Sequence, residues 1–154
     1  MQELREYRQK LMDRLSTAAK EFCAACLAVR DVHCVVQDGW TVHQLAAHTR
    51  DVDKLVYGFR VRQTLEQKNP LFANFNQDAY MAGHYSRVEP LAEILDELVS
   101  NVDSLVDLLR GIPDKAWARE SQHEINGSGF TLQIWVERDL AHIEEHLKTV
   151  KSLA

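Results

Sequence analysis

The sequence predicts an all-α protein, a four-helix bundle formed by a single domain over residues 1–154. Three observations lead to this fold class. Four segments, each of roughly 20 to 30 residues, repeat apolar residues every three or four positions, as a helix with one buried face does. No segment of useful length alternates apolar and polar residues, which is the pattern of a half-buried strand. A chain of 154 residues can also bury a sizeable core without disulfides.

The first helix is expected to begin near Leu4 and to end between Arg30 and Val32. Its neighbouring charged residues place the rest of its surface in solvent, so only one face is buried. The apolar residues on that face are Leu4, Tyr7, Leu11, Leu15, Ala18, Phe22, Cys26 and Val29.

Two of the three cysteines lie one helical turn apart in this segment. Cys23 and Cys26 form a CxxC motif, but a thioredoxin-type motif needs a preceding strand and a helix N-terminus to lower the thiol pKa. An odd number of cysteines argues against a disulfide framework. A zinc site that recruits His33 and Cys34 would normally have a second CxxC motif, which is missing. We therefore expect a buried, unreactive pair.

The second helix is expected from Thr41 to about Glu66. Thr41 and Gln44 have the spacing of a capping box, in which the Thr oxygen accepts a hydrogen bond from a backbone N–H three residues later and the Gln side chain returns to the Thr N–H. Gly58 is a weak point within the helix. Pro70 lies just beyond its end, where a helix cannot continue.

Residues 70–86 lack a helical repeat and form a connection that is long for a compact bundle. We expect one short helical turn within it, around Gln77 to Met81. A connection this long can carry the chain back along the bundle, so the second and third helices can run in the same direction.

The third helix is expected over residues 91–109, where leucines repeat at helical spacing. Pro90 suits its first turn, where no backbone donor is lost. Gly111 and Pro113 stop it. A second loop leads to the fourth helix, which is expected over residues 131–150.

The charge of the chain limits its partners. The formal net charge is −5, and binding to a phosphate backbone needs a clustered basic surface, so we expect no nucleic acid partner. No apolar run approaches the roughly 20 residues needed to cross a bilayer, so we expect no membrane association. The N-terminal residues have no apolar segment after their charges, unlike a secretory signal, and a cytoplasmic protein is expected.

Three of the seven histidines stand out by their positions. His48 takes a place in the apolar stripe of the second helix where a leucine is usual. His142 and His146 are four residues apart on the fourth helix, about 40° around it, so their imidazoles can converge on one ion. The zincin motif has the same spacing but needs a Glu after the first His, where this chain has Ile143. Burying three imidazoles without partners is costly, because each keeps a polar nitrogen that needs one, and one divalent ion can serve all three rings.

The other histidines are not expected to join this site. His43 lies about 140° around the second helix from His48, so the two cannot share a centre. His33, His84 and His123 are near helix ends or in loops, and we expect ordinary surface roles for them.

The sequence resembles the DinB-like (YfiT-like) superfamily of metal-binding four-helix bundle proteins over nearly its whole length. The motif W-[TS]-V-x-x-L-x-x-H is present as Trp40–His48, with the Asp that follows it at Asp51, and the lead G-x-T-L-x-x-W is present as Gly129–Trp135. The resemblance implies an up-down-down-up topology, which agrees with the long connection between the second and third helices. It also implies one divalent metal ion held by His48, His142 and His146.

A site with three histidine ligands leaves the ion at least one open position, which is the pattern of catalytic rather than structural zinc. Imidazole suits several metals, so zinc or nickel is expected first and iron is also allowed. The open position can hold a water, whose pKa falls toward about 7, or a thiolate. The partner is then a small-molecule substrate or a thiol cosubstrate.

Two classes of function stay open. One is a metal-dependent enzyme, either a hydrolase or a low-molecular-weight-thiol S-transferase, as in proteins similar to this one. The other is a stress-response binding module in which the metal is structural or regulatory, without catalysis. A fourth protein ligand such as His84, His123 or a cysteine would favour the second class. Pairing into a homodimer through the first helix is a further expectation.

Several other side chains can support the site. A ligand histidine needs an acceptor for its second ring nitrogen, and three carboxylates lie near the ligands in sequence. The alternative interpretation is that these carboxylates are only exposed to solvent. Possible proton donors lie in the second helix and in the long connection, which could fold over the site. The carboxylates are Asp51, Asp139 and Glu145, and the donors are Tyr57, Tyr80, Tyr85 and His84.

Overall fold

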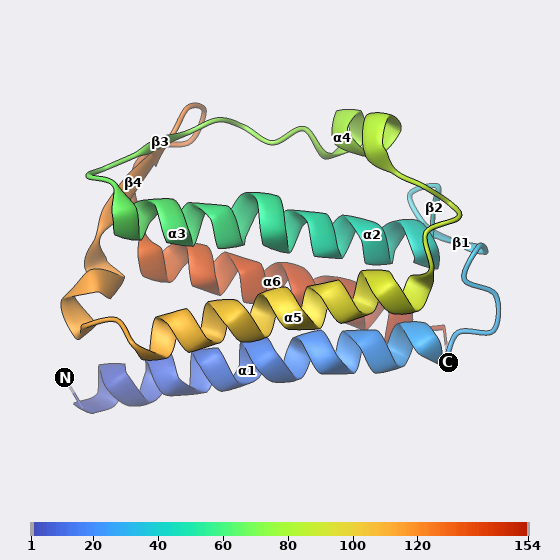
Figure 1. Ribbon diagram of the computed structural model, residues 1–154, viewed down its shortest axis with the longest axis horizontal. Coiled ribbons are helices and arrows are strands. Elements are labelled where there is room, and N and C mark those ends of the chain that lie inside the picture. Colours follow the sequence, from blue (N-terminus) through green and yellow to red (C-terminus); the bar gives the residue numbers. More distant parts are fainter. Residues whose placement is uncertain (1, 154) are drawn as a thin grey trace.

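Four long helical stretches lie side by side in the computed structural model, which describes residues 2–153 (Figure 1). The second stretch consists of three helical elements that follow one another without a break. The all-α four-helix bundle is therefore confirmed. The stretches are α1 (Gln2–Leu27), α2 (Val42–Val52) with η1 (Asp53–Gly58) and α3 (Phe59–Glu66), α5 (Leu91–Arg110), and α6 (Leu132–Lys151).

The direction of the helices follows from Figure 1. α1 and α6 run one way along the bundle, whereas α2–α3 and α5 both run the other way. The segment between α3 and α5 returns along the outer side of α2–α3 and carries β3 (Leu71–Phe72) and α4 (Gln77–His84). The expected helical turn at Gln77 to Met81 is thus present and extends to His84.

The first helix ends at Leu27, earlier than the expected residues 30–32. At this point the backbone hydrogen bonds change from a four-residue to a three-residue spacing: the N–H of Val29 donates to the carbonyl of Cys26 at 3.2 Å. Such a tight turn closes a helix C-terminus. A short hairpin follows, formed by β1 (Val35–Gln37) and β2 (Trp40–Thr41).

The capping box at the start of α2 is confirmed. Thr41 Oγ1 accepts from the N–H of Gln44 at 3.1 Å, and Gln44 Oε1 accepts from the N–H of Thr41 at 2.9 Å. This cap fixes where the helix begins and therefore which residues face the core.

The middle of the second stretch is a π-helix, η1, which was not predicted. Its backbone bonds span five residues instead of four, so each turn holds an extra residue. Gly58 ends this π-helix, and a Cβ atom on it would lie 2.6 Å from the carbonyl oxygen of Asp53. The expected weak point at Gly58 is therefore a position where only glycine fits without a shift of the backbone.

A small sheet, which the sequence pattern did not predict, covers one end of the bundle. β3 pairs in parallel with β4 (Glu120–His123), and β4 pairs antiparallel with β5 (Gly127–Thr131), just after the 3₁₀ turn η2 (Asp114–Ala118). These strands have two to five residues, which is too short for a clear alternation of apolar and polar residues.

The core lies between the four helical stretches and includes the CxxC segment. Cys26 is fully buried and Cys23 is half-buried, and both are free thiols, as is the exposed Cys34. Burial raises the pKa of the Cys23 thiol to about 11 and that of Cys26 to about 12. Both are therefore protonated at neutral pH, which agrees with an unreactive pair.

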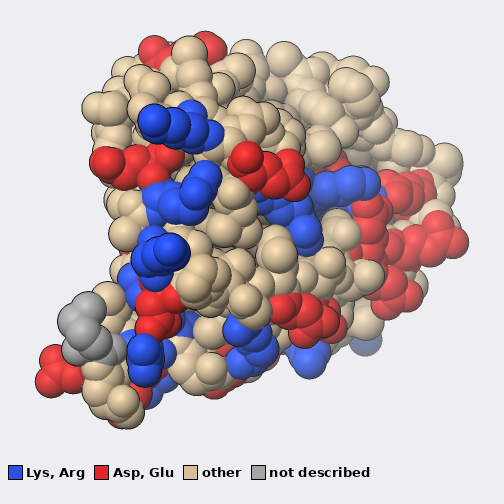
Figure 2. Space-filling view, turned by 60° about the vertical axis from the view of Figure 1, so that its left-hand side comes forward, with Lys and Arg blue, Asp and Glu red and all other residues tan. Residues whose placement is uncertain are grey.

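The surface shown in Figure 2 mixes both signs of charge. Basic side chains form a narrow line at the left of the view, interrupted by acidic ones, and acidic side chains gather at the right. Within residues 2–153 no helix has the length and apolar character needed to span a membrane. The expectations about nucleic acid and a homodimer stay predictions.

Candidate metal centre

His48 lies in the second turn of α2 and points into the bundle. The capping box sets the phase of α2, so that residue 48 falls on the same buried side as Leu45 and Val52. Its side chain is 3% exposed. The Trp40 ring meets it edge to face, with 4.8 Å between the ring centroids.

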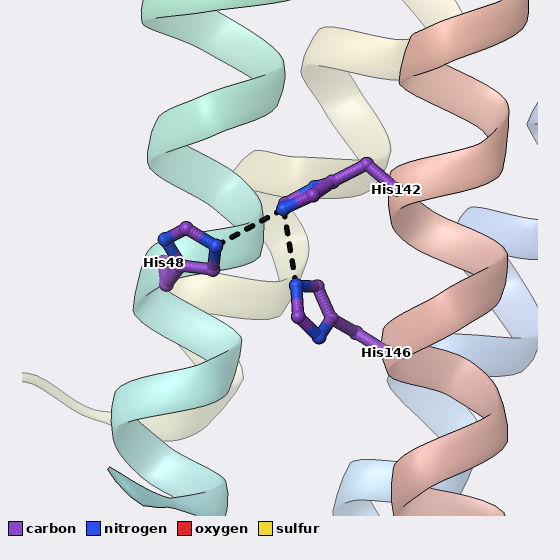
Figure 3. A group of neighbouring side chains, drawn as sticks. All are labelled: His48, His142 and His146. Atoms are coloured by element: carbon purple, nitrogen blue, oxygen red, sulfur yellow. Dashed lines mark hydrogen bonds between the residues drawn. The ribbon is translucent and has the colours of Figure 1, made fainter. Parts of the chain in front are cut away.

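His142 and His146 come from successive turns of α6 and point at His48, as Figure 3 shows. The Nε2 atom of His142 lies 3.0 Å from Nε2 of His48 and 3.0 Å from Nε2 of His146. The three donor atoms lie within 4.8 Å of one another. The structure thus brings together all three histidines that the sequence singled out.

The spacing of these nitrogens fits a single ion. A Zn–N distance of about 2.0–2.1 Å in a tetrahedral site places two ligand nitrogens about 3.3 Å apart. The two pairs that include His142 are 3.0 Å apart, and the third pair lies within 4.8 Å. Without an ion, three facing ring nitrogens cannot all be satisfied by one another, because a neutral imidazole has one donor and one acceptor. The residues present therefore fit one divalent ion bound through Nε2.

Burial keeps the three rings in the form that binds a metal. Burial, together with the charge of His146, lowers the pKa of His48 to about 4, and burial together with the charges of His146 and His48 lowers that of His142 to about 2. Burial also lowers the pKa of His146, against the nearby Glu145, which raises it. All three imidazoles are neutral at pH 7, so their lone pairs are free for an ion.

None of the carboxylates expected to support the ligands is hydrogen-bonded to a ligand histidine among the described residues. Asp51 pairs with Arg50 at 2.9 Å, and Glu145 is exposed at the pocket. Asp139 is fully buried, yet neither of its oxygens has a hydrogen-bond partner among the described residues. The Nδ1 atoms of His142 and His146 are also buried without a partner in that part of the chain.

Asp139 belongs to a buried pair of carboxyl groups with Asp53 of η1, which the sequence did not predict. Burial raises the pKa of Asp53 to about 6, and burial together with Asp53 raises the pKa of Asp139 well above its usual range. The two residues are far apart in the chain and become neighbours only because η1 packs against α6, so no local pattern could reveal the pair.

Of the proposed proton donors, one lies near the histidines. The Tyr57 ring centroid is 6.0 Å from that of His142, and burial raises the pKa of Tyr57. Tyr80 instead stacks on His84 at 4.0 Å, and the Tyr85 hydroxyl bonds Nδ1 of His43 at 2.5 Å.

The remaining histidines stay outside the group of three. His43 is buried, and its Nε2 also contacts the carbonyl of Glu89 at 2.7 Å. The expected surface role of His123 is wrong, because it is 4% exposed in the middle of the small sheet. There its Nδ1 accepts from the backbone N–H groups of Ile125 and Asn126.

A pocket of about 470 Å³ opens in front of the three histidines. It lies between α2, α6, the β1–β2 hairpin and the start of α4, so residues from four separate segments shape it. Trp40 is the first residue of the motif that ends at His48, whereas the residues of α4 could not be assigned to the site from the sequence. The lining residues are Gln37, Asp38, Trp40, Leu45, His48, Gln77, Asp78, His142, Glu145 and His146.

Comparison with known proteins supports the resemblance seen in the motifs. The sequence model of the DinB superfamily matches residues 3–150. Among solved structures, the chain is similar to YfiT from Bacillus subtilis, described as a probable metal-dependent hydrolase with an unusual four-helix bundle topology. That match covers 96% of this chain and 86% of the other at 21% identity, with a TM-score of 0.88, and it shows a shared fold. The comparison with curated proteins gave no match.

Proposed function

Because this chain belongs to the DinB superfamily, we propose that it is a metal-dependent enzyme whose single divalent ion is held by His48, His142 and His146. Zinc or nickel is the expected ion. The observation that carries the proposal is the convergence of three neutral imidazoles at the floor of a pocket, with no fourth His, Cys, Asp or Glu in the group among residues 2–153. Structural zinc sites are usually closed by four protein ligands, whereas catalytic sites keep one position open.

The bound ion would lower the pKa of a coordinated water or thiol toward neutrality and so supply a nucleophile at pH 7. The chain's own residues hold and shield that position. Trp40 and Leu45 cover part of the pocket wall with apolar surface, which limits the water that reaches it. Helix α4 adds the polar side of the pocket through Gln77 and Asp78.

Two reactions fit this arrangement. One is hydrolysis, which YfiT is described as probably performing. The other is transfer of a low-molecular-weight thiol to an electrophile bound in the pocket. Both need the same open position, so the proposal covers both and excludes a purely structural ion.

An activity screen tests the proposal. The zinc- or nickel-loaded protein is assayed against ester and amide substrates, and against electrophiles in the presence of glutathione, bacillithiol or the cationic thiol cysteamine. The His48→Ala variant is compared with His84→Ala, which removes an exposed histidine on α4. We expect turnover in the parent and in His84→Ala, and its loss in His48→Ala. Turnover that persists in His48→Ala would contradict the proposal.

A further inference from the structure

We infer that the pocket in front of the histidines selects substrates that carry an ammonium-type cation beside the reacting atom. This inference rests on the proposed function and names its substrate class. Three carboxylates line the pocket, those of Asp38, Asp78 and Glu145, and no Lys or Arg does so among the described residues. Anionic substrates, including anionic thiols, are disfavoured.

The three carboxylates come from three separate elements that meet only in the folded chain. Asp38 lies in the turn between β1 and β2, Asp78 in the first turn of α4, and Glu145 on α6. None of them forms an ion pair within residues 2–153. Their charge is therefore not neutralised by a neighbouring cation of the chain.

Local structure holds two of these carboxylates in place. Asp38 has a φ of 49° and Gly39 a φ of 83°, as in the tight two-residue turns that join paired strands. Asp78 follows Asn76, which caps α4 by accepting from the N–H of Ala79 at 3.0 Å. The backbone that carries each carboxylate is thus ordered by its own hydrogen bonds and turn geometry.

The pocket also shows independent signs of a ligand. His146, with an exposed fraction of 8%, lines it and has a buried Nδ1 without a partner in the described part of the chain. Gln37 lines it as well, and its buried Oε1 has no partner among the described residues. Trp40 presents an aromatic ring there, and aromatic faces attract cations.

The charge balance favours a cation even when a metal is bound. A divalent ion contributes two positive charges, and the three lining carboxylates contribute three negative ones. A bound ion would attract the reacting water or thiolate at short range, whereas the carboxylates that line the same pocket would act on the rest of the substrate. Charges of one sign in a concave site focus the field and raise the local concentration of the opposite charge.

A matched set of thiols tests the inference on cobalt(II)-loaded protein. Cysteamine, 2-mercaptoethanol and 3-mercaptopropionate each offer one thiol to the open position, and their tails are cationic, neutral and anionic. Binding is followed at low ionic strength by the thiolate-to-cobalt charge-transfer band. Because the thiols differ in their own pKa, the quantity compared is the ratio of the cysteamine and 3-mercaptopropionate dissociation constants in different variants.

The double variant Asp38→Asn and Asp78→Asn removes two of the pocket carboxylates and keeps their shape. The control, Glu66→Gln and Asp107→Asn, removes the same net charge outside the pocket. We expect the parent's preference for cysteamine to shrink by about three- to tenfold in the pocket variant, as partly screened charges a few ångströms away would produce. It should stay unchanged in the control. Cobalt content and its ligand-field spectrum show whether each variant keeps the site.

The possible outcomes separate the two proposals. If thiols bind and the ratio is the same in all three proteins, the inference is wrong and the proposed function stands. The inference is equally wrong, with the proposed function intact, if the parent prefers 3-mercaptopropionate. If no thiol produces the band in a cobalt-loaded protein, the open position does not exist, and both the proposed function and this inference are overturned.

Discussion

Replacing Gly58 with alanine should destabilise this protein, although the same change stabilises most helices. An added Cβ would lie 2.6 Å from the carbonyl oxygen of Asp53. The oxygen is a backbone atom and the Cβ is attached directly to the backbone, in a stretch that packs against α5 and α6, so neither atom can move freely. Relief requires a shift of roughly half an ångström or more, or conversion of η1 to an α-helix. Conversion would rotate the residues of α3 relative to α2, including the buried Val61 and Thr64.

The magnitude follows from two opposing terms. Overpacking in a buried site costs about 1–3 kcal/mol, and a contact of 2.6 Å with a backbone atom falls in the upper part of that range, about 2–3 kcal/mol. Replacing Gly by Ala inside an ordinary helix gains about 1 kcal/mol. We therefore expect Gly58→Ala to lower the free energy of unfolding by about 1–2 kcal/mol. Gly83 in α4 is the matched control, since a Cβ there meets no atom within 4 Å. Gly83→Ala should leave stability unchanged or raise it by up to about 1 kcal/mol.

Urea unfolding followed by circular dichroism measures both variants against the parent. The comparison uses midpoints at a common m-value, because a changed m-value would signal a different unfolded or native state. If Gly58→Ala is as stable as the parent or more so, the π-helix is not a fixed feature of the native chain and the reasoning fails.

Three further predictions concern the buried Asp53, the buried histidines and the Thr41 cap of α2. The difference in free energy of unfolding between Asp53→Asn and the parent should shift in favour of the variant as pH rises from 4 to 8, by up to about 3 kcal/mol. Burial raises the pKa of Asp53 to about 6, so its ionisation in the folded parent is unfavourable. A difference that is equal at both pH values would contradict this. In metal-free protein, burial and the charges of neighbouring histidines lower the pKa of His48 to about 4 and that of His142 to about 2, so each ring opposes folding below pH 6.5, whereas the raised pKa of Asp53 acts in the opposite direction. The His48→Ala variant is therefore compared with the parent by urea unfolding in EDTA, and it should gain about 2 kcal/mol relative to the parent between pH 7.5 and pH 5; a difference that does not change with pH would refute the effect. Thr41→Ala should cost about 1 kcal/mol through loss of the α2 cap, and an unchanged midpoint would rule that role out.

The helices and the three histidines could be predicted because each leaves a local pattern. A helix that buries one face repeats its apolar residues at a spacing set by its geometry. His48 interrupts such a stripe, and the spacing of His142 and His146 places both on one side of α6. The convergence of all three then followed from the cost of burying unpaired nitrogens.

Other features depend on contacts that no short stretch of sequence contains. The strands of the small sheet form because segments around residues 71, 121 and 129 meet at one end of the bundle, and the same pairing buries His123. The π-helix reads as continuous α-helix in sequence, because its altered backbone bonding leaves no local pattern except Gly58, where a Cβ would meet the carbonyl oxygen of Asp53. The pocket carboxylates could not be grouped either, because three separate elements bring them together.

The metal content of the purified protein tests the central claim most directly. The parent, His48→Ala and His84→Ala are purified without a nickel column, dialysed against zinc and then against metal-free buffer, and analysed by elemental mass spectrometry. We expect about one divalent ion per chain in the parent and in His84→Ala, and a large loss in His48→Ala. A parent that retains no ion, or a His48→Ala variant that retains as much as the parent, would contradict the claim that these three histidines hold the metal.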